Sequence, residues 1–149
     1  MTPAPTIHAS AVLVGAKAVL IRGPAGSGKS HLVLELLQRA AAGAIPFARL
    51  VGDDRVHLAA ESSRLMVRPA AELAGLLEIR GFGIRRLPYE PLAVVGLIVD
   101  LGAAAERLPG PKGLETSISG LLLPRLAVPE GASAVPAVLA ALGFPGSGI

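Results

Sequence analysis

Residues 23–30 combine glycines, a lysine and a serine at the spacing found in phosphate-binding loops. The pattern G-x-x-x-x-G-K-[ST] is matched in full by Gly23, Pro24, Ala25, Gly26, Ser27, Gly28, Lys29 and Ser30. Glycines let the backbone wrap around a phosphate so that several N–H groups point inward. In such loops the lysine contacts the β- and γ-phosphates of ATP and the following hydroxyl binds Mg²⁺, so we expect both groups to be ligands. The alternative is a chance match in a chain with 18 glycines.

Two adjacent carboxylates, Asp53 and Asp54, follow a short apolar run at 48–51. Beside a phosphate-binding loop, one carboxylate can hold Mg²⁺ while the other accepts the proton of an incoming hydroxyl. An ordinary turn is the alternative, since Asp is a common turn residue. The sequence leaves open which of the two would be the base.

Other polar residues could join this chemistry or be structural. Glu78 is a carboxylate between apolar neighbours and could bind metal or face water from a strand, and His8 precedes the first strand without a role of its own. Four arginines could neutralise phosphate or face solvent: Arg80, Arg85, Arg86 and Arg107.

The elements around the loop fit a phosphate-binding unit. Residues 11–21 read as two short β runs about a turn at 15–17, and the second run leads into the loop. From Lys29 to about Ala42 apolar residues recur at helical spacing, and Gly43 is a plausible stop. A strand, a glycine-rich loop and a helix in succession favour a functional loop over a chance match.

The rest of the chain predicts further short elements around a buried strand. Strands are expected at 48–51, 56–59, 64–67, 92–101 and 121–128, and short helices at 69–77 and 134–142; residues 77–84 are Gly-punctuated and give no clear assignment. The pattern predicts one α/β domain over residues 1–149, with a P-loop and a mixed β-sheet.

Composition narrows the function classes. Hydrophobic residues make up 52% and charged residues 17%, which is globular. With 3% aromatic residues, a net charge of +3 and no long basic run, nucleic-acid binding is not expected. The chain has no Cys and shows neither a signal-peptide pattern nor a membrane-length apolar run, so we expect a cytoplasmic protein that does not bind membranes.

Four segments, in their order along the chain, resemble the catalytic domain of the bacterial HPr kinase/phosphorylase family. They are His8, the loop at 23–30, Leu50-Val51-Gly52-Asp53-Asp54, and Leu77-Glu78-Ile79-Arg80-Gly81-Phe82-Gly83-Ile84. The last segment discriminates, because a general P-loop ATPase has no reason to carry it. The resemblance runs from about residue 8 to residue 128.

The resemblance implies a fold of the HPr kinase and PEP carboxykinase type. It also implies transfer of the ATP γ-phosphate to a serine of HPr, a small phosphocarrier protein of the sugar phosphotransferase system. The family can reverse the modification, with inorganic phosphate attacking phosphoserine to give pyrophosphate. A homo-oligomer is implied as well, a hexamer in the family.

Roles for single residues follow from the matching positions. Lys29 would hold phosphate, and Asp54 would be the acid/base, with His8 beside it. The implied Mg²⁺ ligands are Ser30, Glu78 and Asp53, the last of which could instead support the base. Arg107 falls where the family places a catalytic arginine.

Two departures from the family shape the expectation. The usual chain carries an extra N-terminal domain, which is expected to be missing here. A basic segment linked to phosphorolysis aligns with residues 127–134, where both arginines are absent and Glu130 is present. We therefore expect kinase activity more than phosphorylase activity. Two rivals stay open: a small-molecule kinase or P-loop ATPase, and a non-enzymatic nucleotide-sensing regulator.

Overall fold

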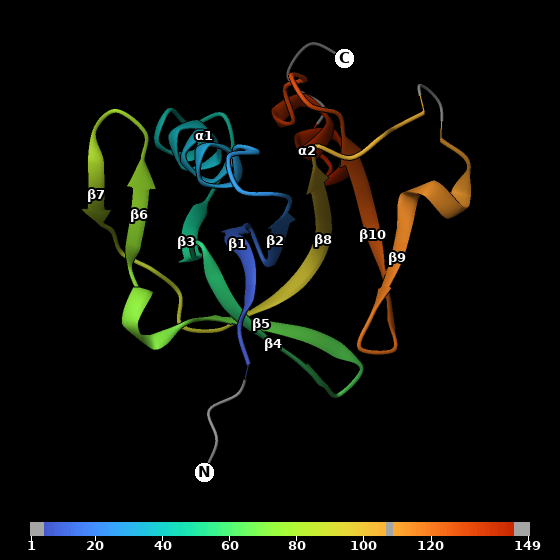
Figure 1. Cartoon of the computed structure of the whole chain (residues 1–149), viewed down its shortest axis with the longest axis horizontal. Helices are drawn as coiled ribbons and strands as arrows, with labels where there is room; N and C mark the ends of the chain where they lie inside the picture. The colour runs from blue at the N-terminus through green and yellow to red at the C-terminus, as the bar shows by residue number, and fades with distance from the viewer. Residues whose placement is uncertain (1–4, 107–108, 145–149) are drawn as a thin grey trace.

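A computed structural model describes residues 5–106 and 109–144 (Figure 1). Its helices are α1 (Lys29–Ala41) and α2 (Val135–Ala141), with short 3-10 helices at Ala71–Leu73 and Pro111–Leu114. Its strands are β1 (Ile7–Val14), β2 (Lys17–Arg22), β3 (Ala48–Gly52), β4 (Arg55–Glu61), β5 (Arg64–Pro69), β6 (Leu76–Ile79), β7 (Gly83–Arg86), β8 (Ala93–Leu101), β9 (Glu115–Ile118) and β10 (Leu121–Val128).

The main sheet is mixed, as predicted. Its strands pair in the order β3-β1-β2-β8-β10-β9. Strands β2, β8 and β10 run parallel, whereas β1 is antiparallel to both β2 and β3. The carboxyl ends of β2, β3 and β8 therefore lie at one edge of the sheet, where ligands of open α/β sheets commonly bind.

A second layer closes the opposite side of the sheet. The β4–β5 hairpin pairs with the first residues of β1 and of β8, below the main sheet in Figure 1. The helices α1 and α2 lie on the other side (Figure 1). Each face of the main sheet is thus covered.

Alternation along the strands separates two apolar cores. In β2, Val19 and Ile21 pack toward the helices, whereas Ala18 and Leu20 pack toward the β4–β5 layer. Side chains of a strand point to opposite faces in turn, so a strand covered on both sides is apolar throughout. This explains the nearly continuous apolar run of β8.

Most predicted elements are confirmed, and four segments differ from what the sequence predicts. The segment 69–77 is not one helix: it holds only the 3-10 turn Ala71–Leu73, because Gly75 at φ +78° reverses the chain into β6. Residues 76–86, left mostly unassigned, form the β6–β7 hairpin. β9 was missed, and β1 begins at Ile7, four residues before the predicted run. In the described part of the chain, no helix has the length and apolar character needed to cross a membrane.

Candidate active site

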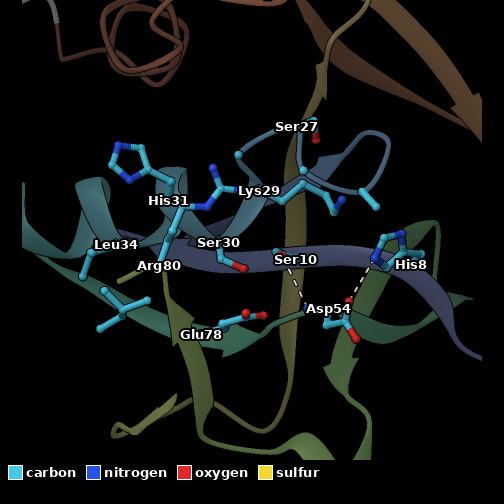
Figure 2. A pocket seen from close by; sticks show the side chains of 14 residues that line it. His8, Ser10, Ser27, Lys29, Ser30, His31, Leu34, Asp54, Glu78 and Arg80 are labelled. Carbon is cyan, nitrogen blue, oxygen red and sulfur yellow. Dashed lines mark hydrogen bonds and ion pairs between the residues drawn. The ribbon is translucent and has the colours of Figure 1, made fainter. Parts of the chain in front are cut away.

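A cavity of about 680 Å³ opens at the sheet edge where β2 and β3 end (Figure 2). Its walls come from β1, the loop before α1, the first turns of α1, the β3–β4 turn and β6. The residues that line it are His8, Ser10, Ala25, Gly26, Ser27, Gly28, Lys29, Ser30, His31, Leu34, Asp54, Glu78, Ile79 and Arg80. It therefore gathers the phosphate-loop motif, one of the two aspartates and the Leu-Glu-Ile-Arg segment.

The loop between β2 and α1 packs closely at its first residue and turns sharply at its last glycine. A Cβ on Gly23 would lie 2.6 Å from the Ser27 Oγ and 2.9 Å from the Leu101 carbonyl oxygen, so only glycine fits there. Gly28 caps α1 at φ +98°, in the left-handed region that glycine adopts without strain. The loop is thus held against β8 and presents the N-terminus of α1 to the cavity.

Lys29 folds back over the loop. Its Nζ donates to the carbonyl oxygens of Gly23 and Pro24 at 2.9 and 3.1 Å. Burial lowers the pKa of the Lys29 ammonium below its ordinary value of 10.5, while the nearby charges of Asp54 and Asp53 oppose that shift. An ammonium that lies at the cavity and, within the described part of the chain, is hydrogen-bonded only to neutral carbonyl oxygens is suited to receive an anion.

Asp53 is a buried hub of hydrogen bonds. Its carboxylate accepts from the Ser30 Oγ at 2.7 and 2.9 Å, from the Ser10 Oγ at 2.7 Å, and from the backbone N–H of Glu78 at 3.2 Å. These contacts join β1, α1 and β6 to the end of β3. Because it is buried and accepts all these hydrogen bonds, Asp53 fixes the positions of Ser10, Ser30 and the start of the Glu78 segment.

Asp54 lies in a different environment one residue later. The backbone turns there at φ +67°, which Asp tolerates better than most residues. Its carboxylate accepts from the His8 Nε2 at 2.9 Å, and the two side chains are 61% and 39% exposed (Figure 2). Asp54 is therefore an accessible carboxylate facing the cavity, oriented by a histidine.

The oxygen groups of the cavity fit a hard divalent cation. Ser30 and Glu78 line the cavity, and the buried Asp53 lies directly behind Ser30, whose Oγ donates to it. Together they offer a hydroxyl and two carboxylates, which are ligand types that Mg²⁺ prefers. Among residues 5–106 and 109–144, no three His, Asp or Glu side chains cluster as a complete metal site. A Mg²⁺ ion with waters and substrate phosphates as its remaining ligands fits this partial set.

The structure brings most of the predicted site residues together, although the candidate arginines Arg85 and Arg86 do not line the cavity. His8, the loop, both aspartates and Glu78 meet at one edge, whereas Arg107 lies outside the described residues. Sequence reasoning missed Ser10 and His31. Alternation along β1 could have suggested the first, because Ser10 stands on the same strand face as His8.

A second charged cluster at the same sheet edge was also missed. Asp100, at the end of β8, accepts from Arg22 at 2.7 and 2.9 Å and from Arg125 at 2.5 Å. Arg22 directly precedes the loop, so this cluster ties the root of the loop to β8 and β10. Burial of Asp100 raises the pKa of its carboxyl, but the hydrogen bonds and charges of both arginines outweigh burial and hold that pKa below 3.8.

The mixed sheet and the strand–loop–helix unit define an α/β protein of the P-loop class. The family model described as "HPr Serine kinase C-terminal domain" matches residues 1–87, and the chain belongs to that family.

Similar proteins agree with this assignment. The HPr kinase/phosphorylase of Limosilactobacillus reuteri (strain DSM 20016) is 32% identical over 142 residues, covering 87% of this chain and 42% of that protein. That of Geobacillus thermodenitrificans is 34% identical, covering 87% and 43%. The solved Hpr(Ser) kinase/phosphatase from Coxiella burnetii superposes with a TM-score of 0.72 at 26% identity, covering 93% of this chain and 87% of that one. The chain spans about two fifths of the length of these curated relatives.

Proposed function

We propose that this protein is an ATP- and Mg²⁺-dependent serine kinase whose acceptor is HPr or a related phosphocarrier protein. The observation that carries the proposal is the accessible Asp54–His8 pair beside the lysine of the phosphate loop, in a chain of the HPr kinase family. A carboxylate at that place can accept the proton of a hydroxyl that attacks a phosphate bound in the loop.

Different residues of the site would bind the phosphates of ATP and the Mg²⁺ ion. Backbone N–H groups of the loop, Pro24 excepted, would bind the phosphates, and Lys29, which now donates to two loop carbonyls, would donate to phosphate oxygens instead. Ser30, Asp53 and Glu78 would hold Mg²⁺, which neutralises phosphate charge when bound.

Proton transfer falls to Asp54. The acceptor serine oxygen forms a bond to the γ-phosphorus, the bond from that phosphorus to the bridging oxygen breaks, and ADP leaves. The serine proton passes to the Asp54 carboxylate, which His8 holds in position. We assign Asp54 rather than Asp53 because Asp53 is buried and already accepts from Ser10 and Ser30.

Further parts of the proposal come from the family. Arg107 would stabilise the transferring phosphoryl group. The whole chain would form one catalytic domain, which is supported by β8 and β10 sharing the sheet of the matched segment. As an ATP-dependent enzyme it would act in the cytoplasm, as a homo-oligomer, without nucleic acid or membrane as partners.

The reverse reaction would be weak. Residues 127–134 carry no Lys or Arg, Glu130 is exposed there, and the nearby Arg125 is held by Asp100. Inorganic phosphate, a free anion, is thus offered little positive charge from this segment.

A transfer assay separates this proposal from its rivals. The purified chain is incubated with Mg-ATP and HPr, and phosphoserine on HPr is measured by mass spectrometry. We expect one phosphoserine per HPr. ATP binding without transfer would favour a nucleotide sensor, and turnover with a metabolite but not with HPr would favour a small-molecule kinase.

A further inference from the structure

The β6–β7 hairpin stands beside the cavity with one strand buried and the other open to solvent. Leu77 and Ile79 of β6 pack into the core that α1 covers. All four residues of β7, from Gly83 to Arg86, are exposed. In Figure 1 the hairpin projects at the side of α1, away from β9 and β10. Its outer strand is therefore accessible to another protein.

Two large apolar side chains of this hairpin are exposed to solvent. Phe82 is 64% exposed and Ile84 is 68% exposed. Phe82 is one of three phenylalanines in the chain, and its large ring is exposed to solvent instead of packing in the core. Adjacent exposed apolar groups bordered by charge are typical of protein interaction sites.

The border of these apolar groups is positively charged. Arg80, Arg85 and Arg86 belong to the hairpin, and none forms an ion pair within residues 5–106 and 109–144. The Arg85 guanidinium lies 4.2 Å from the centroid of the Phe82 ring, a cation–π distance, so the charged and apolar groups are in contact. Against three arginines, the segment 76–86 holds a single carboxylate, Glu78.

The hairpin borders the cavity, and Ile84 of its outer strand is paired with Glu78 of its inner strand. Glu78, Ile79 and Arg80 line the cavity, and the Glu78 N–H donates to Asp53. A protein bound to β7 would therefore lie beside the cavity that the phosphate loop and Asp54 line.

We propose that the exposed turn and outer strand of this hairpin dock the protein substrate beside its acceptor serine. The surface consists of Phe82, Ile84, Arg85 and Arg86, with Arg85 on the opposite side of the strand from Ile84 and Arg86, and is here called the hairpin face. The inference rests on the proposed function and names the surface that function would use. The matching region of the substrate would be apolar with carboxylates at its edge. A symmetric contact with the same face of a second copy of this chain is a poorer alternative, because it would bring like charges together.

The test compares steady-state transfer to HPr by the wild type, two hairpin variants and two control variants. The double variant Phe82→Ser/Ile84→Ser removes the apolar groups, and Arg85→Glu/Arg86→Glu reverses the charges. Matched controls are Leu122→Ser, 67% exposed on the β9–β10 hairpin, and Arg64→Glu on the β4–β5 hairpin. Binding of a fluorescent ATP analogue and the oligomeric state are measured for each protein.

We expect the hairpin variants to raise the KM for HPr by about tenfold or more, with ATP-analogue affinity and oligomeric state unchanged. For the charge-reversal variant, added salt should weaken the reaction less than in the wild type. The controls should keep the wild-type KM.

Other results would overturn the inference in distinguishable ways. An unchanged KM in both hairpin variants, with normal transfer by the wild type, contradicts the docking face alone. A changed oligomeric state in the hairpin variants assigns this face to contacts between copies. Absence of transfer by the wild type contradicts the proposed function, and the docking inference falls with it.

Discussion

Asp53 and Asp54 are neighbours in the chain but lie in opposite environments. Asp53 is buried among Ser10, Ser30 and a backbone N–H, whereas Asp54 is accessible and contacts His8. The left-handed backbone at Asp54 turns the two carboxylates apart. One residue pair can thus hold the loop serine with one member and leave the other free to accept a proton.

A first prediction at this scale concerns Lys29. The charge of Asp54 opposes the effect of burial on the Lys29 ammonium, so Asp54→Asn should lower the pKa of Lys29 further below 10.5. The chain has three lysines, so ¹³Cε resonances can be followed individually through a pH titration by NMR. Glu61→Gln, on the distant β4–β5 hairpin, should leave the Lys29 titration unchanged. A Lys29 pKa that stays or rises in Asp54→Asn would count against the coupling.

Among the elements, β8 and its neighbours fix the root of the phosphate loop. Arg22 of β2 and Arg125 of β10 donate hydrogen bonds to Asp100 from the two strands that flank β8. The folded-state pKa of Asp100 is lowered, so its ionised form stabilises the fold above about pH 3.8. That stabilisation is lost as the pH falls through the folded-state pKa.

Asp100→Asn should lower the free energy of unfolding by about 2 kcal/mol at pH 7, because the negative charge between two arginines is lost and an NH₂ group replaces one of the two accepting oxygens. The difference between wild type and variant should shrink as the pH falls below about 3.8. Urea unfolding at several pH values measures this, with Glu61→Gln as the control. A difference that is absent at pH 7, or that grows in acid, would contradict the role of the cluster.

The sequence predicted the local elements of the site better than its long-range contacts. The loop and α1 could be predicted because a motif and a helical period lie within one short stretch. The hydrogen bond from Ser10 to Asp53 and the Arg22–Asp100–Arg125 cluster could not be, since strand pairing joins residues far apart in the chain. β9 was missed because Glu115-Thr116-Ser117-Ile118 is a short, largely polar edge strand.

At the scale of the whole molecule, the segment 127–134 offers no positive charge that could attract inorganic phosphate to the protein. The segment 127–134 does not line the cavity and carries no Lys or Arg. With phosphoserine-HPr and inorganic phosphate as substrates, we expect pyrophosphate to form at least about tenfold more slowly than HPr is phosphorylated by ATP. A coupled pyrophosphate assay measures this, and comparable rates in the two directions would refute the expectation.

The central claim is that Asp54 takes the serine proton during transfer from ATP to HPr. The most direct measurement is single-turnover transfer by wild type, Asp54→Asn and the control Glu61→Gln, together with ATP-analogue binding. Asn also tolerates the left-handed backbone at position 54, so this change removes the base and keeps the turn. We expect Asp54→Asn to slow transfer by about a hundredfold or more while ATP-analogue binding is retained. Transfer by Asp54→Asn at the wild-type rate would contradict the account.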